Sequence, residues 1–217
     1  MTVLTKNHVL DLIDATGTVL ILRMESATAA EKVAHAAVEG GIRALEIPLT
    51  VPDALGAIRR LRKDLGSDVV VGAGTVLTPE DAERAVDAGA GLLVTPHVAP
   101  DVIATAIRHD VVGIGGAFSP TEVVQSHRAG ADLVKLFPAE VHGPAYLRSI
   151  LAPLAHIPVC PTGGVSIDNV GDWFDAGARA VGMASSITKA GGPDLDKAAI
   201  AAAAREFLTA VSAVRRP

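Results

Sequence analysis

The chain has 217 residues, 49% of them hydrophobic and 20% charged, a composition that suits a large buried core and excludes wholesale disorder. The net charge of −5 and the 3% content of aromatic residues argue against a nucleic-acid partner, which needs basic patches or stacking platforms. No apolar run reaches transmembrane length, and the N-terminus lacks a signal-peptide pattern. We therefore expect a cytoplasmic protein that binds neither membranes nor nucleic acids.

The first predicted element is an amphipathic helix over residues 6–15. Eight short apolar runs follow, each ending in a turn rich in Gly, Pro or Thr, and segments with helical spacing separate them. A final alanine-rich helix is predicted over residues 193–216. The hydroxyl residues that precede three helical segments are predicted N-caps, namely Thr78, Ser119 and Ser166. The apolar runs cover residues 18–23, 43–49, 68–74, 91–96, 111–116, 132–138, 157–164 and 180–185.

Eight strands that alternate with eight helices predict an α/β protein with a (β/α)₈ TIM barrel. The extra N-terminal helix would close the bottom of the barrel, and we expect one domain over residues 1–217. The main alternative is an open doubly wound sheet, which needs a glycine-rich loop after an early strand. The sequence VGAGT at 71–75 is a poor match to that loop, because it lacks the third glycine and a suitable acidic partner.

Active-site residues of such barrels come from the C-terminal ends of the strands. Most other charged residues fall on the helical segments, where they are expected to be solvated. The candidates at the strand ends are Arg23, Glu46, Thr75, Pro96, Lys135, Thr162, Gly163, Gly164 and Ser185.

Residues 131–140, ADLVKLFPAE, place Lys135 inside an apolar strand pattern. A charged ammonium in a strand buried on both faces is costly unless it is paired or neutral. A lysine whose head reaches water is the ordinary structural explanation, but it suits a surface helix better than a central strand. We interpret Lys135 as a nucleophilic amine that forms a Schiff base with a ketone.

Glu46 lies between apolar neighbours in RALEIPL. It could be a structural partner of Arg23, or a general acid/base within reach of the substrate held by the lysine. A carboxyl group in such a site can have a raised pKa that suits proton transfer. We favour the general acid/base.

The sequence PTGGV at 161–165 could be a tight turn that simply requires glycine. Barrels, however, often bind phosphate in the loops after strands seven and eight, and Gly163 and Gly164 follow predicted strand seven. Ser185 ends predicted strand eight. We therefore predict a phosphate site formed by these two loops.

Metal and thiol chemistry are not expected. The histidines are scattered without metal-ligand spacing, and His97 is interpreted as a loop residue. Cys160, in the apolar run IPVC, is expected to be an inert buried thiol.

Five motifs appear in chain order: RALEIPLTVPDA, VGAGTVLTPE, LLVTPH, LVKLFPAEVHGPAYLRSI and VCPTGGVSIDNVGDWFDAGARAVGMASSI. They resemble the 2-keto-3-deoxy-6-phosphogluconate (KDPG) aldolase family from about residue 18 to residue 190. The order and spacing of VKLFPAE and PTGGV make the resemblance specific. It implies a class I aldolase on a (β/α)₈ barrel, without metal or organic cofactor, and usually homotrimeric.

The resemblance also implies roles for individual residues. Lys135 matches the Schiff-base lysine, Glu46 the general acid/base, and Thr75 a threonine near the pyruvate carboxylate. Phe137 matches the pocket aromatic, and Arg23 an arginine at the end of strand one. Contacts with the substrate hydroxyls and phosphate are implied for Thr162, Gly163, Gly164 and Ser185.

Two positions depart from the family pattern. Many members carry an arginine four residues after the glutamate, where it contacts the substrate carboxylate, and here that place is Thr50. We keep Thr50 as a candidate substrate-binding residue and expect the carboxylate contact to fall on Arg23 and Thr75. Gly115 stands where proline is common.

The expected reaction is cleavage of KDPG, a phosphorylated 2-keto acid, to pyruvate and glyceraldehyde 3-phosphate. Alternatives within the family are the galactonate-derived epimer, which differs at C4, and 4-hydroxy-2-oxoglutarate. Members that act on the galacto epimer tend to have valine where this chain has Thr162, which favours the gluconate series. A phosphosugar isomerase or epimerase would share the glycine loop but would not need Lys135. A catalytically inactive assembly protein would need neither the glycine loop nor Lys135.

Overall fold

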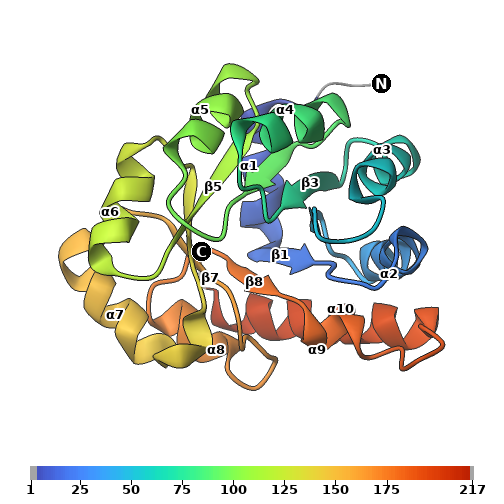
Figure 1. Ribbon diagram of the computed structural model, residues 1–217. Coiled ribbons are helices and arrows are strands. Elements are labelled where there is room, and N and C mark those ends of the chain that lie inside the picture. The colour runs from blue at the N-terminus through green and yellow to red at the C-terminus, as the bar shows by residue number, and fades with distance from the viewer. Residues whose placement is uncertain (1–3, 216–217) are drawn as a thin grey trace.

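The computed structural model describes residues 4–215 and shows a central barrel of parallel strands surrounded by helices (Figure 1). Every strand is short and fully buried, as expected for strands covered on both faces. The strands are β1 (Thr18–Ile21), β2 (Ala44–Pro48), β3 (Val70–Gly74), β4 (Leu92–Val94), β5 (Val112–Ala117), β6 (Leu133–Leu136), β7 (Val159–Pro161) and β8 (Val181–Met183).

Helices connect successive strands, so the prediction of a (β/α)₈ barrel is confirmed. The helix before β1 is α1 (Lys6–Thr16). The others are α2 (Ala27–Glu39), α3 (Ala54–Leu65), α4 (Pro79–Asp87), α5 (Pro100–Arg108), α6 (Pro120–Arg128), α7 (Gly143–Leu154), α8 (Val170–Asp175), α9 (Ser185–Thr188) and α10 (Lys197–Val214), with a 3₁₀ turn, η1, at Ala139–Val141.

The strands are paired in the order β7-β6-β5-β4-β3-β2-β1-β8, all parallel. Strands β7 and β8 are the two ends of this order, and they meet through a parallel bridge between Thr162 and Gly182. The N–H of Arg179 also donates to the carbonyl of Val159 at 2.9 Å. We call this joint the β7–β8 seam, and it closes the barrel.

Apolar side chains fill the N-terminal half of the barrel interior. Because successive side chains of a strand point to opposite faces, every second residue faces inward. Val9 and Ile13 of α1 pack against this inward set, so the predicted role of the extra helix in closing the bottom is confirmed. The strand residues of this inner cluster include Val19, Ala44, Val70, Leu92, Val112, Leu133 and Cys160.

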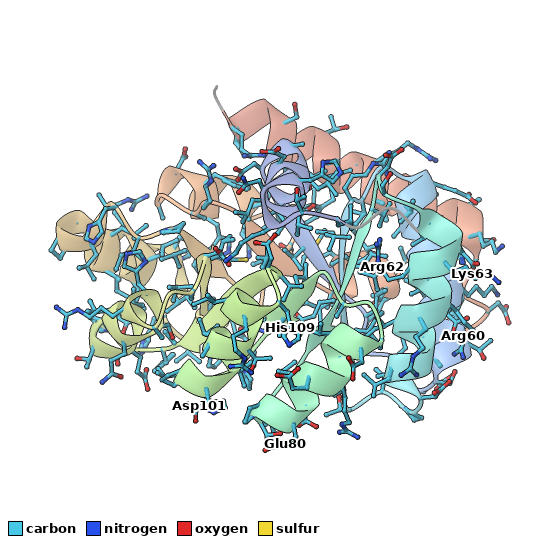
Figure 2. All side chains as sticks on the ribbon, turned by 90° about the horizontal axis from the view of Figure 1, so that it is seen from above. Arg60, Arg62, Lys63, Glu80, Asp101 and His109 are labelled. Carbon is cyan, nitrogen blue, oxygen red and sulfur yellow. The ribbon has the colours of Figure 1, made fainter. Side chains whose placement is uncertain are left out.

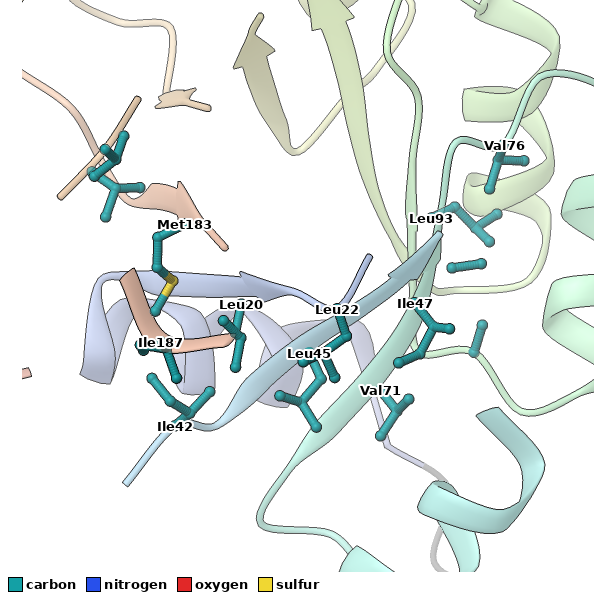
Figure 3. Packing of buried hydrophobic residues seen from close by; sticks show 14 of the residues in the cluster. Leu20, Leu22, Ile42, Leu45, Ile47, Val71, Val76, Leu93, Met183 and Ile187 are labelled. Atoms are coloured by element: carbon teal, nitrogen blue, oxygen red, sulfur yellow. The ribbon is translucent and has the colours of Figure 1, made fainter. Parts of the chain in front are cut away.

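A second apolar layer lies between the strands and the helices outside them (Figure 3). It contains the alternate strand residues, such as Leu20, Leu45 and Val71, together with the buried faces of the helices. Charged side chains lie on the outer helices, as Arg60 and Lys63 of α3 show (Figure 2). Over the described residues, none of the helices is both long and apolar enough to cross a bilayer.

The predicted helix ends are mostly confirmed. The side chains of Thr78 and Ser119 cap α4 and α6, and Ser119 forms a full capping box with Glu122. The prediction for Ser166 is wrong, because α8 begins only at Val170. The backbone N–H of Ser166 instead donates to the side chain of Asn169, in a turn before the helix. The last helix spans Lys197–Val214, within the predicted range.

Candidate active site

Strand alternation explains why three polar residues project into the C-terminal half of the barrel. Glu46 follows the inward-facing Ala44 by two residues, and Lys135 follows Leu133 in the same way. Thr162 follows Cys160 by two residues, just beyond the end of β7. All three therefore share the inner face with the apolar cluster below them.

Glu46 and Lys135 form a buried pair across the barrel. The Nζ atom of Lys135 lies 3.8 Å from Oε2 of Glu46, and the two residues are only 6% and 2% exposed, respectively. This separation exceeds a normal hydrogen bond, so the two groups are close ionic neighbours. The Nζ atom also lies 5.3 Å from the ring centroid of Phe137.

Burial raises the pKa of the Glu46 carboxyl above its usual value, because a buried carboxylate loses its hydration. The positive charges of Lys135 and Arg23 favour the carboxylate and oppose this rise without cancelling it. The carboxyl also needs space. A side chain at Gly74 would overlap it, so the glycine of β3 makes room for Glu46. Glu46 is thus placed to hold or release a proton beside the lysine.

A pocket of about 190 Å³ opens above Lys135 at the C-terminal end of the barrel. Residues from β1, β6 and β8 and from the segment directly after β7 surround it, so it lies over the β7–β8 seam. Seven of the eleven predicted site residues line this pocket, Lys135 among them. The predicted residues that line it are Arg23, Lys135, Phe137, Thr162, Gly163, Gly164 and Ser185.

The loop after β7 has a conformation that requires glycine. Gly163 and Gly164 have φ angles of 101° and 69°, in the left-handed region that other residues rarely adopt. Glu140 lies against both glycines, and a side chain on either of them would overlap it. Ser186 ties this loop to the next one by donating its hydroxyl proton to the carbonyl of Val165 at 3.0 Å.

Thr162 has a structural partner that the sequence did not indicate. Its hydroxyl lies where a Cβ on Gly182 would stand, so Gly182 allows Thr162 to pack across the seam. The hydroxyl also makes a long contact, 3.4 Å, with the carbonyl of Cys160. The run VGM of β8 was the available signal, because a central glycine in a buried strand often marks close backbone approach.

Glu46 and three other predicted residues do not line the pocket. Glu46 reaches it through its contact with Lys135. Thr75 directly follows β3, is partly buried and has a φ angle of 54°. Pro96 is also partly buried, in the turn after β4. Thr50 is exposed in the turn after β2.

The predicted buried thiol is confirmed, since Cys160 is 2% exposed. Burial raises the pKa of this thiol to about 12, which keeps it protonated and unreactive at neutral pH. Within residues 4–215, no cluster of three or more His, Cys, Asp or Glu side chains is arranged to hold a metal ion.

Comparisons with known proteins identify the family of the chain. The model of the KDPG and KHG aldolase family matches residues 9–201. A probable 2-dehydro-3-deoxy-6-phosphogalactonate aldolase from Rhizobium meliloti is 40% identical over 80% of this chain and 82% of its own length. A 2-dehydro-3-deoxy-phosphogluconate aldolase from Pseudomonas aeruginosa is 41% identical over 65% of this chain and 64% of its own length. A solved structure described as native KDPGal superposes with a TM-score of 0.84 at 31% identity, covering 91% of this chain and 95% of that one.

Barrel and family together define an aldolase, which is a carbon–carbon lyase. More particularly, the chain belongs to the KDPG and KHG aldolase family.

Proposed function

We propose that the chain is a class I aldolase that cleaves KDPG to pyruvate and glyceraldehyde 3-phosphate through a Schiff base on Lys135. The observation that carries this proposal is the buried pair of Lys135 and Glu46 directly below a pocket. An amine so placed can attack a ketone, and the adjacent carboxyl can move the protons that each step requires. The iminium supplies the electron sink, so the mechanism needs no metal or organic cofactor.

In the first half of the reaction, the neutral amine of Lys135 adds to C2 of the 2-keto acid and forms a carbinolamine. Glu46, 3.8 Å away, takes up and returns the protons, and loss of water gives the iminium. Burial raises the pKa of Glu46 above its usual value, so the group holds a proton more readily than an exposed carboxyl and can still release it beside the positive charges of Lys135 and Arg23.

In the second half, the Glu46 carboxylate removes the proton of the C4 hydroxyl. The C3–C4 bond breaks, its electron pair moves to the iminium as an enamine, and glyceraldehyde 3-phosphate leaves. Protonation of the enamine at C3 restores an iminium, and its hydrolysis releases pyruvate and the free amine. The water released when the first iminium forms is matched by the water consumed in the final hydrolysis, so the reaction needs no other co-reactant.

The pocket wall suggests how substrate would be held. We assign the phosphate to the N–H groups of Gly163 and Gly164, in the loop after β7, and to the hydroxyl of Ser185, which begins α9 just after β8. The substrate carboxylate would be held by Arg23 and Thr75. The more peripheral contacts would come from Phe137, Thr162, Pro96 and Thr50.

A second candidate substrate is the 2-keto-3-deoxy-6-phosphogalactonate epimer. The Rhizobium relative named for that substrate covers more of this chain than the Pseudomonas relative named for the gluconate. We keep the gluconate first because this chain has Thr162, on the pocket wall, where members of the family that act on the galacto epimer tend to have valine. We also propose a homotrimer, as the family resemblance implies.

Borohydride trapping tests the chemistry. Pyruvate with borohydride should inactivate the protein and add one pyruvyl group to Lys135, mapped by mass spectrometry, while chelation should leave turnover unchanged. Lys135→Met serves as the control and should take up no label. Label on Lys189 or another exposed lysine of the wild-type protein would refute the assignment.

Parallel kinetics with the two C4 epimers test the substrate. A higher kcat/KM for the gluconate series supports the first candidate, and a higher value for the galactonate series replaces it with the second. Sedimentation of the same preparation tests the trimer.

A further inference from the structure

Two buried hydroxyl groups outside the pocket form hydrogen bonds with the backbone near the end of β5. The ladder between β4 and β5 pairs Leu92, Leu93 and Val94 with Val112, Gly113 and Ile114. Its last bond on this side runs from the Thr95 N–H to the Ile114 carbonyl, at 3.0 Å. Beyond that point, side-chain hydroxyls form the hydrogen bonds with the backbone N–H and carbonyl of Gly116.

The Thr95 hydroxyl makes two well-formed hydrogen bonds. It accepts from the N–H of Gly116 at 2.9 Å and donates to the carbonyl of His97 at 2.6 Å. The Ser126 hydroxyl, from α6, donates to the Gly116 carbonyl at 2.7 Å. Thr95 is 0% exposed and Ser126 is 1% exposed, so the two bonds to Gly116 are shielded from water. Each hydroxyl proton therefore has one defined direction.

This network lies beside the lysine. Gly116 is the register partner of Lys135 on the neighbouring strand. A side chain at Gly116 would overlap the backbone between Pro96 and His97, so the turn after β4 rests directly on this glycine. The Thr95 hydroxyl thus holds the turn, which carries the candidate residue Pro96, against the strand that borders Lys135.

We propose that Thr95 is a positioning residue for the lysine chemistry, assisted by Ser126, which binds the carbonyl of Gly116. It acts by fixing the Pro96–His97 turn and the end of β5 beside Lys135. This inference rests on the proposed Schiff-base function. Its effect should fall on adduct formation rather than on phosphate binding, because the proposed phosphate loops follow β7 and β8, away from β4.

The test is Thr95→Val, which keeps the shape of the side chain and removes the hydroxyl. We expect kcat and the rate of pyruvate trapping to fall together by about 10–100-fold, the scale of a small misplacement of reacting groups, with KM changed by less than about threefold. Thr95→Ser restores the hydroxyl and should recover most of both rates. Thr105→Val is the matched control, because Thr105 is also 0% exposed and hydrogen-bonded but lies on α5.

Stability alone would not produce this pattern. Thr95→Val and Thr105→Val should lower the denaturation midpoint similarly, and only the former should slow trapping. Trapping by Thr95→Val at the wild-type rate, or slowed no more than by Thr105→Val, overturns the proposal. If wild-type protein forms no pyruvate adduct, the proposed function fails, and the positioning role fails with it. Where wild-type protein does form the adduct, a crystal structure of Thr95→Val checks the geometry: a turn displaced from Gly116 supports the inference, and an unmoved turn refutes it.

Discussion

The two ends of the barrel interior are built from the same strands but have opposite character. At the N-terminal end, inward side chains such as Val70, Leu92 and Leu133 pack against Ile13 of α1. At the C-terminal end, two residues further along their strands, Glu46 and Lys135 face each other below an open pocket. The first end buries apolar surface, which stabilises a fold, and the second buries charge, which is costly.

This difference separates stability from chemistry within one set of strands. The apolar end can hold the strands in register without help from the ionic end. A carboxyl with a raised pKa and a lysine can then remain in a position that would be unfavourable on stability grounds alone. Substitutions at the ionic end should therefore lower activity more than stability, and substitutions at the apolar end should lower stability more than activity.

The largest expected effect comes from Lys135→Met at the ionic end. Turnover and pyruvate trapping should both be abolished, because no other group can form the iminium. The fold should persist, since Glu46 can take up a proton once its cationic neighbour is gone. Activity assays and near-UV circular dichroism check the two parts, and measurable turnover by this variant would contradict the assignment.

Glu46→Gln should be less severe than the lysine change. The amide keeps the size of the side chain but accepts no proton, and general acid–base groups typically contribute about 10²–10⁴-fold. Turnover should fall by roughly that factor, while borohydride trapping survives at a reduced rate. The acidic limb of the wild-type pH–rate profile, where Glu46 is protonated, should disappear. Near-normal turnover with an unchanged limb would make Glu46 a structural partner only.

At the apolar end, Ile13→Ala should lower stability and leave activity unchanged. Loss of a fully buried aliphatic side chain should lower the free energy of unfolding by about 2–5 kcal/mol, because α1 would leave a cavity below the barrel. At temperatures where the variant is folded, kcat should match the wild type. Ile107→Ala is the control, since this isoleucine is 51% exposed and its truncation should change stability little. A large loss of kcat at Ile13 would show that the two ends are coupled.

The smallest expected effect is a pH-dependent difference in stability. The pKa of Glu46 is raised on folding, so its contribution to stability is fully present below the unfolded pKa and is lost as the pH rises through the folded pKa. Glu46→Gln stays neutral throughout. The stability of the variant relative to the wild type should therefore increase as the pH rises from about 4.5, the unfolded value. Urea titrations across this range measure it, and a difference independent of pH would contradict the raised pKa.

The sequence predicted the barrel and the two charged residues, Lys135 and Glu46, for the same physical reason. Buried parallel strands are short apolar runs, so a single charge inside a run is conspicuous, as Lys135 and Glu46 are. Contacts that depend on the distance between strands could not be predicted in this way. The fit of Thr162 against Gly182 and the bonds between Thr95 and Gly116 are set by register and barrel closure. The cap predicted at Ser166 failed because a turn held by Asn169 competes with the helix start.

The β7–β8 seam has a mechanical consequence for ligand binding. The barrel closes there through the Thr162–Gly182 bridge and the bond from Arg179 to Val159, whereas the neighbouring pair β1 and β8 is joined by a regular ladder. The proposed phosphate loops start from the two sides of this joint. A phosphate bound from both sides would then add contacts across this joint, so substrate binding would also stabilise the closure of the barrel.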